Sequence, residues 1–155
     1  MLEDRFTLLL KDLSALLKIE MKPDKNNSCL LNIKDKLKVQ LELDTNNQSV
    51  LIIASVLGEL SPGKFREDIL LSALKANAKP YPRIGNFAYS TKLNSLVLSS
   101  SLNIDHFKAE NVLAVLTPFF HKAYAWKDAI DRGESDHRLD EKDFTNTNTD
   151  NIFEL

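Results

Sequence analysis

The chain has 155 residues, a formal net charge of −2 at pH 7, 43% hydrophobic residues and 27% charged residues. This length suits one domain with its own core, and this composition is that of an ordinary globular protein. No secretory signal opens the sequence, and no run of about 18 apolar residues could span a membrane. The single cysteine, Cys29, excludes an internal disulfide. We therefore expect a cytoplasmic protein without a membrane partner.

Charge is unevenly distributed along the chain. Residues 1–133 contain 18 Lys+Arg and 15 Asp+Glu, whereas residues 134–155 contain 2 and 7. The second segment also has few apolar residues, so it cannot bury enough surface to offset the entropy lost on ordering. We predict a folded domain over 1–133 and a disordered acidic segment over 134–155. Two roles stay open for that segment, solubility and contact with a partner.

The first predicted element is an amphipathic helix over residues 2–18. Its apolar residues recur three or four positions apart. Leu8, Leu10 and Leu17 widen the apolar stripe beyond one face. Two explanations stay open: a partner covers part of this helix, or the helix lies deep in its own fold.

Three strands are predicted next, over residues 29–34, 37–43 and 50–57. The middle strand alternates between apolar and polar residues, which indicates a sheet covered on one face and open to water on the other. Residues 34–36 and 44–48 have the composition of short turns. The three strands are therefore expected to form an antiparallel meander.

A second helix is predicted from about Pro62 or Gly63 to Asn77, with Ser61 as its amino-terminal cap and Asn77 in a left-handed closing conformation. This helix is apolar on two sides. One side comprises Phe65, Ile69, Ala73 and Ala76, and Leu70, Leu71 and Leu74 extend it. Such a helix needs two partners, and we expect its own sheet to be one and a second protein chain to be the other.

Two more strands, over residues 86–91 and 93–102, precede a last helix over residues 105–132. Pro118 lies inside that helix and is expected to kink it. The order of elements, α-β-β-β-α-β-β-α, predicts an α+β fold with a mostly antiparallel sheet packed by helices.

No arrangement of residues in the sequence is typical of a catalytic or metal site. His106, His121 and His137 stand apart, and no paired cysteines could bind zinc. The four glycines form no phosphate-binding loop. Cys29 opens an apolar strand and is interpreted as a small buried hydrophobe. We predict no catalytic residue, no metal and no cofactor, although a small enzyme of unrecognised type stays open as a third hypothesis.

A basic cluster of Lys34, Lys36 and Lys38 lies beside the first predicted turn. No aromatic residue is interleaved with these lysines, and proteins that bind single-stranded nucleic acid need aromatic side chains for stacking. We therefore predict no nucleic-acid partner.

Four motifs, in this order, resemble the CesT/SycE family of class I type III secretion chaperones. They are Pro23-Asp24 followed by Cys29-Leu30, Leu57-Gly58-Glu59-Leu60-Ser61-Pro62, Leu70-Leu71-x-Ala73-Leu74-x-Ala76-Asn77, and Phe120-x-x-Ala123-x-x-Trp126. The run from Pro23 to Cys29 is similar to that of chlamydial members. The resemblance spans about residues 2–132 and leaves the acidic segment unmatched.

The resemblance implies a dimeric bacterial chaperone that binds an unfolded amino-terminal segment of a secreted effector. Such a chaperone keeps the segment competent for secretion and targets it to the export apparatus without using nucleotide. The effector is expected on the first helix and the adjoining sheet, at Phe6, Leu9, Leu10, Leu13, Leu17, Leu31 and Ile33. The dimer interface is expected on the middle helix, at Phe65, Ile69, Leu70, Ala73 and Leu74.

Two alternatives remain beside this reading. The dimer partner is either a second copy of the chain or a related chaperone. The function is either that of a secretion chaperone or that of a regulatory adaptor or anti-activator, which would hold a folded partner instead of an extended segment.

Overall fold

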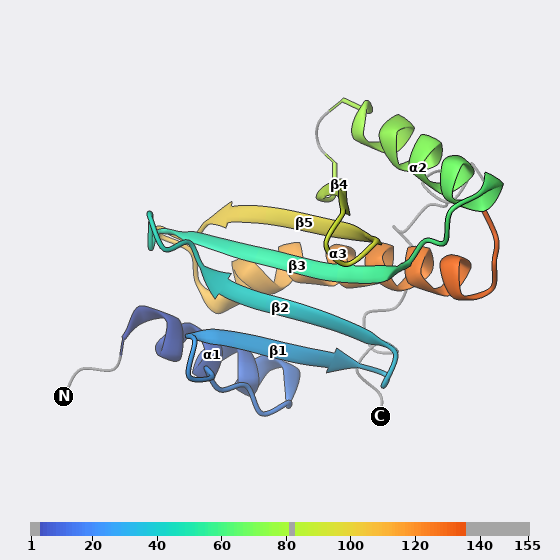
Figure 1. Ribbon diagram of the computed structural model, residues 1–155. Coiled ribbons are helices and arrows are strands. Elements are labelled where there is room, and N and C mark those ends of the chain that lie inside the picture. Colours follow the sequence, from blue (N-terminus) through green and yellow to red (C-terminus); the bar gives the residue numbers. More distant parts are fainter. Residues whose placement is uncertain (1–3, 81–82, 136–155) are drawn as a thin grey trace.

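A five-stranded sheet forms the centre of the molecule, and helices pack around it (Figure 1). The computed structural model describes residues 4–80 and 83–135. The elements are α1 (Arg5–Leu17), β1 (Ser28–Ile33), β2 (Leu37–Leu43), β3 (Val50–Glu59), α2 (Lys64–Asn77), β4 (Asn86–Ser90), β5 (Ser95–Asn103) and α3 (Ala109–Asp131). This order is the predicted one, so the α+β prediction is confirmed.

The strand order in the sheet is β1-β2-β3-β5-β4, and every neighbouring pair is antiparallel. Lys34 and Asp35, in the β1–β2 turn, have φ values of 52° and 53°. Two residues with positive φ are typical of the tight hairpin turn whose twist matches that of the strands. β1 and β4 are at the two ends of the strand order and so form the edges of the sheet.

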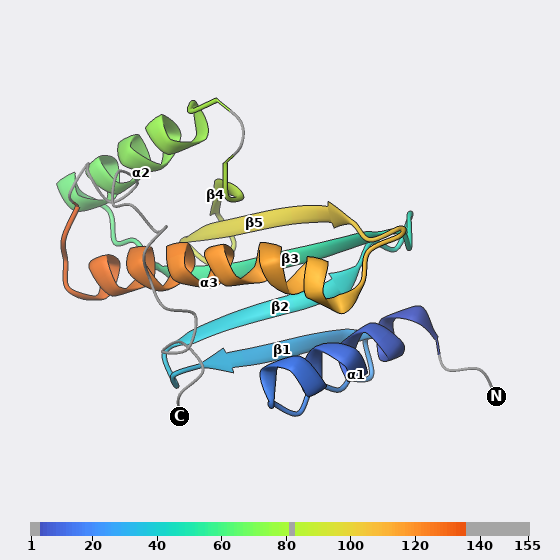
Figure 2. The same ribbon diagram turned by 180° about the vertical axis from the view of Figure 1, so that it is seen from behind.

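One face of the sheet carries the hydrophobic core. α1 and α3 both lie on this face, as the two opposite views show (Figures 1 and 2). Alternate strand residues point into the core, because successive side chains of a strand face opposite sides. Fully buried members of the core include Val39, Leu41, Leu51, Ile53, Leu98, Leu10, Leu13, Leu116, Phe119 and Phe120. No helix of the described residues packs across the opposite face, in agreement with the prediction of one covered face.

α2 lies beside the β4 edge and makes its main contacts there (Figure 1). The Asn77 side chain donates from Nδ2 to the Phe87 carbonyl and accepts from the Phe87 N–H, both at 2.8 Å. Asn77 is thus a helical residue that fixes α2 to β4, and the prediction of a left-handed Asn77 was wrong. The predicted Ser61 cap was also wrong, because α2 begins only at Lys64 and Gly63 precedes it with a φ of 136°.

Other boundaries also differ from the prediction. α3 begins at Ala109 instead of residue 105, because His106 has a φ of 64°, which interrupts a helix. Asn103 accepts the Asp105 N–H at 2.8 Å and so forms a turn before α3. β5 begins two residues late because Asn94, with a φ of 50°, belongs to the β4–β5 turn. The prediction for residues 136–155 lies outside the described residues.

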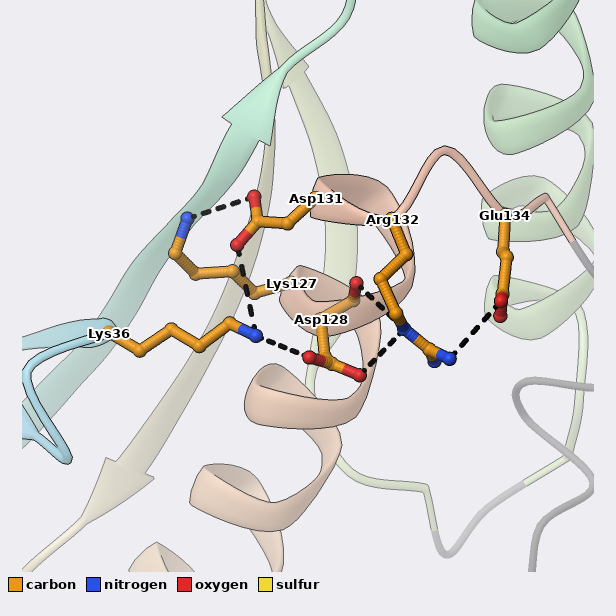
Figure 3. A network of polar contacts seen from close by, with 6 residues as sticks. All are labelled: Lys36, Lys127, Asp128, Asp131, Arg132 and Glu134. Atoms are coloured by element: carbon orange, nitrogen blue, oxygen red, sulfur yellow. Dashed lines mark hydrogen bonds and ion pairs between the residues drawn. The ribbon is translucent and has the colours of Figure 1, made fainter.

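Ion pairs join the β1–β2 turn to the carboxyl-terminal end of α3 (Figure 3). The Lys36 ammonium donates to Asp128 and lies 4.0 Å from Asp131. Arg132 Nε contacts the second oxygen of Asp128 at 2.9 Å. The hydrogen bond from Lys36 is the main reason that the pKa of Asp128 is lowered, and it raises the pKa of Lys36 in return.

Candidate protein-binding surfaces

The described residues offer little for chemical catalysis. Within residues 4–80 and 83–135, no group of three His, Cys, Asp or Glu side chains could hold a metal ion. Cys29 is buried, which raises the pKa of its thiol and keeps it protonated, as expected of a small core residue. In the same part of the chain, no helix combines the length and the apolar character needed to cross a membrane. We therefore looked for surfaces that could hold another polypeptide.

The first surface is a groove of about 600 Å³ between α1 and the start of α3, here called the α1–α3 groove. Its lining residues are Arg5, Leu9, Asp12, Ala15, Leu16, Ile104, Phe107, Lys108, Ala109 and Glu110. Leu16 and Phe107 remain 41% and 43% exposed, so the lining includes large apolar side chains in contact with water. Exposed apolar area of this kind marks a candidate site for a protein partner.

Polar contacts fix the end of the α1–α3 groove where α1 begins. Arg5 pairs with Asp105 at 2.8 Å and donates to the Ile104 carbonyl at 2.9 Å, which ties the start of α1 to the segment before α3. Asp4 caps α1 by accepting the Thr7 N–H at 2.8 Å. The start of α1 is thus fixed to the segment before α3, and the lining of the groove contains charged residues of both signs.

The seven residues predicted to bind an effector all lie in the core. Phe6, Leu10, Leu13, Leu31 and Ile33 are almost completely buried, and Leu9 and Leu17 are the least buried at 9% and 8% exposed. α1 sinks this deep because it packs against the sheet and α3 together. Of the seven, only Leu9 also lines the α1–α3 groove. The predicted contact of these residues with an effector stays a prediction.

The second surface lies on α2, and we call it the α2 face: Leu70, Leu71, Ala73 and Leu74. Leu74 is 66% exposed, and Leu71 is also exposed. Beside them is an apolar hollow of about 220 Å³, lined by Leu70, Ala73, Leu74, Asn77, Phe87, Ala88, Tyr89 and Leu96. An exposed leucine next to an apolar hollow is a self-complementary arrangement, which two-fold dimers require.

The predicted interface residues divide between core and surface. Ile69 and Ala73 are buried within the chain, Phe65 and Leu70 are half-buried, and Leu74 is the most exposed. The structure therefore does bring the predicted residues to one helix, although only part of the set reaches the surface. Whether this surface forms a dimer stays a prediction.

Leu16 and Phe107 are the main groove residues that the prediction missed. Leu16 follows Leu9 by seven positions, a spacing that puts both on one face of a helix. That spacing could have indicated the groove. Phe107 could not have been found in this way, because residues 104–108 form a turn before α3 instead of its first turn.

A sheet with two helices on one face, apolar surfaces and no polar catalytic cluster among the described residues is typical of a module that binds other proteins. The sequence matches the model of the Tir chaperone protein (CesT) family over residues 8–127. The chain therefore belongs to this family of chaperones, and the predicted resemblance is confirmed. The family also confirms the prediction that the protein is a chaperone and not an enzyme. A search of curated proteins finds no match.

Three solved structures have a similar fold. The Yersinia pestis type III secretion chaperone SycH, in complex with a fragment of YscM2, has a TM-score of 0.58 and 22% identity, with 78% of this chain and 98% of that chain covered. The structure of the HopA1–SchA chaperone–effector complex has a TM-score of 0.62 and 16% identity, with 80% of this chain and 94% of that chain covered. The ExsC–ExsE complex has a TM-score of 0.59 and 15% identity, with 79% of this chain and 90% of that chain covered. These structures support the same fold.

Proposed function

We propose that this protein is a dimeric, cytoplasmic type III secretion chaperone. It binds an extended amino-terminal segment of a secreted effector, keeps that segment unfolded and directs it to the export apparatus. No cofactor takes part, because the work is binding and release. The α1–α3 groove holds apolar side chains of the effector, with Leu9, Leu16 and Phe107 as its contacts.

The observation that carries this proposal is the α1–α3 groove in a chain of the Tir chaperone protein family. A groove with exposed apolar side chains and a mixed-charge rim suits an unfolded segment, whose apolar residues otherwise face water. Edge strand β1 lies on the same side of the molecule as α1 (Figure 1), and no strand of the described residues pairs with its outer edge, so an effector segment could add a strand there. Backbone pairing would add affinity with little demand on the effector sequence.

The test is co-purification from the source bacterium with a tagged chain. We expect a secreted protein to co-purify, and limited proteolysis should leave a short amino-terminal segment of it protected. Leu16→Asp and Phe107→Asp should each lower the amount recovered about tenfold, since each puts a charge into an apolar contact. Leu93→Asp is the matched control, because Leu93 is an exposed leucine in the β4–β5 turn, outside the groove.

Two results would contradict the proposal. Protection of a folded domain, without a protected extended segment, would favour the regulatory adaptor. Recovery that is equal for Leu16→Asp, Phe107→Asp and Leu93→Asp would show that the groove does not hold the effector.

A further inference from the structure

The open face of the sheet carries a second groove, which has no role in the proposed function. It measures about 390 Å³, and we call it the sheet-face groove. Its lining residues are Leu30, Lys36, Lys38, Gln40, Ala54, Ser55, Val56 and Lys127. Leu30 and Val56 are 60% and 45% exposed, so apolar side chains of β1 and β3 face water in this groove. The chemistry of the lining therefore suits an occupant with apolar side chains.

Every charged residue in the lining of the sheet-face groove is a lysine. Lys36 pairs with Asp128, and Lys127 lies 3.4 Å from Asp131, so two of the three already have a carboxylate partner on α3 (Figure 3). Within the described residues, the Lys38 ammonium forms no ion pair or hydrogen bond. The groove thus combines an exposed apolar floor with a surplus of positive charge, which suits an acidic occupant.

The same chain contains a segment of this chemistry. Residues 136–155 have six Asp or Glu against two Arg or Lys. Their apolar side chains are Leu139, Phe144, Ile152, Phe153 and Leu155, several of them next to a carboxylate. Acidic and apolar residues in one stretch match the lysines and the apolar floor of the groove.

The segment is also joined to the element that lines the groove. Lys127 lies near the carboxyl-terminal end of α3, and the chain continues from Asp131 to Ser135 and then into residues 136–155. An extended chain spans about 3.3 Å per residue, so five residues cover roughly 17 Å. Covalent attachment of this kind gives an effective concentration of about a millimolar, which makes even a weak contact well populated.

We propose that residues 136–155 bind in the sheet-face groove of their own chain. Their carboxylates pair with Lys38 and, in exchange with Asp131, with Lys127, while apolar side chains cover Leu30 and Val56. The segment thereby occupies a face that would otherwise be open to acidic partners. This inference does not depend on the proposed effector site, which lies on the helical side of the sheet.

The test is carbodiimide coupling of carboxylates to lysines in the full chain, with the coupled peptides identified by mass spectrometry. We expect residues 136–155 to couple to Lys38 and Lys127 about fivefold more than to Lys75 or Lys92, which are exposed lysines on α2 and in the β4–β5 turn. In about 1 M NaCl, where the Debye length is about 3 Å, this preference should fall. Lys38→Glu should lower coupling to Lys127 about fivefold, and Lys92→Glu should leave it unchanged.

A separate variant tests the apolar contact between residues 136–155 and the sheet-face groove. Val56→Asp should lower coupling to Lys38 about fivefold, whereas Leu93→Asp should not alter it. Val56 lies on the open face, so its substitution leaves the core in place, which circular dichroism would confirm.

An equal mixture of isotope-labelled and unlabelled chains distinguishes binding within one chain from binding between two chains. Coupled peptides that carry a single label type support binding within the chain. Peptides of mixed label would instead assign the groove to the segment of a second copy and overturn the proposal. Equal coupling to all exposed lysines would overturn it as well.

Discussion

Gly58 shows how one residue decides the path of the chain between the sheet and α2. The register of β3 against β5 shifts between Val56 and Gly58, so an extra residue bulges at this point. Gly58 has a φ of 149°, and a Cβ placed on it would lie 2.9 Å from Cγ2 of Ile130. The glycine therefore allows both the backbone conformation and the close approach of α3.

Gly58→Ala is expected to destabilise the fold by about 2–4 kcal/mol, from backbone strain and overpacking together. Gly63→Ala is the matched control, because Gly63 has a similar φ of 136° but no atom within 4 Å of the added Cβ. Urea unfolding should show that Gly58→Ala costs at least about 1 kcal/mol more than Gly63→Ala, the lower end of an overpacking penalty. Equal losses would mean that contact with Ile130 contributes nothing.

At the scale of elements, the sequence predicted each helix and strand of the described residues, from apolar periods and from apolar runs between turns. The strict alternation from Leu37 to Leu43 indicated β2, and the apolar spacing of three or four indicated the helices. Boundaries depended on local contacts that no period reports. α2 begins late because Gly63 precedes it, and Asn77 stays helical because it binds the backbone of Phe87, a partner ten residues away.

The candidate surfaces were harder to predict than the elements, for a physical reason. An amphipathic pattern shows that a helix is apolar on two sides, but not what covers each side. On α1, Leu10 and Leu17 are covered by the same chain, whereas Leu8 and Leu16 remain exposed. On α2, the apolar side chains outside the core do reach the surface, at Leu71 and Leu74. Which leucines of α1 are covered depends on the position of α3 relative to α1, and that tertiary contact is not visible in the pattern of the sequence.

The contact between the β1–β2 turn and α3 predicts a dependence of stability on pH. The pKa of Asp128 is lowered mainly by its hydrogen bond with Lys36, so this contribution is present above the ordinary value of about 3.9 and is lost as the pH falls through the lowered value. The pKa of Lys36 is raised mainly by the same bond, so its contribution is present below about 10.4 and is lost as the pH rises through the raised value. The pair therefore stabilises the fold across the neutral range.

Asp128→Asn should lower the free energy of unfolding at pH 7 by about 0.5–1 kcal/mol, as for a partly exposed pair. It should also make stability fall less steeply as the pH drops below about 4. Urea unfolding between acid and neutral pH measures both effects. Glu59→Gln, at an exposed carboxylate, is the control and should change neither. A variant that keeps the full acid dependence of the wild type would exclude Asp128 as its source.

At the scale of the whole molecule, the two proposed surfaces lie at opposite ends of the fold. The α1–α3 groove is on the helical side, towards the β1 edge, and the α2 face is beside the β4 edge (Figures 1 and 2). Two chains joined through α2 would therefore leave the α1–α3 groove of each chain open. An extended effector segment could then contact both chains, which would increase its affinity through multivalency.

The dimer can be tested without the effector. The wild-type chain should sediment as a dimer at micromolar concentration, and Leu74→Asp should weaken association at least about 100-fold, because it buries an unpaired carboxylate. A dimer that is more stable than its monomer also has a Tm that rises with protein concentration, and Leu74→Asp should remove this dependence. Leu8→Asp, at an exposed leucine on α1, should keep both the dimer and the concentration dependence. A monomeric wild-type chain, or a dimeric Leu74→Asp variant, would show that the α2 face does not join two copies, because Leu74 is its most exposed apolar side chain.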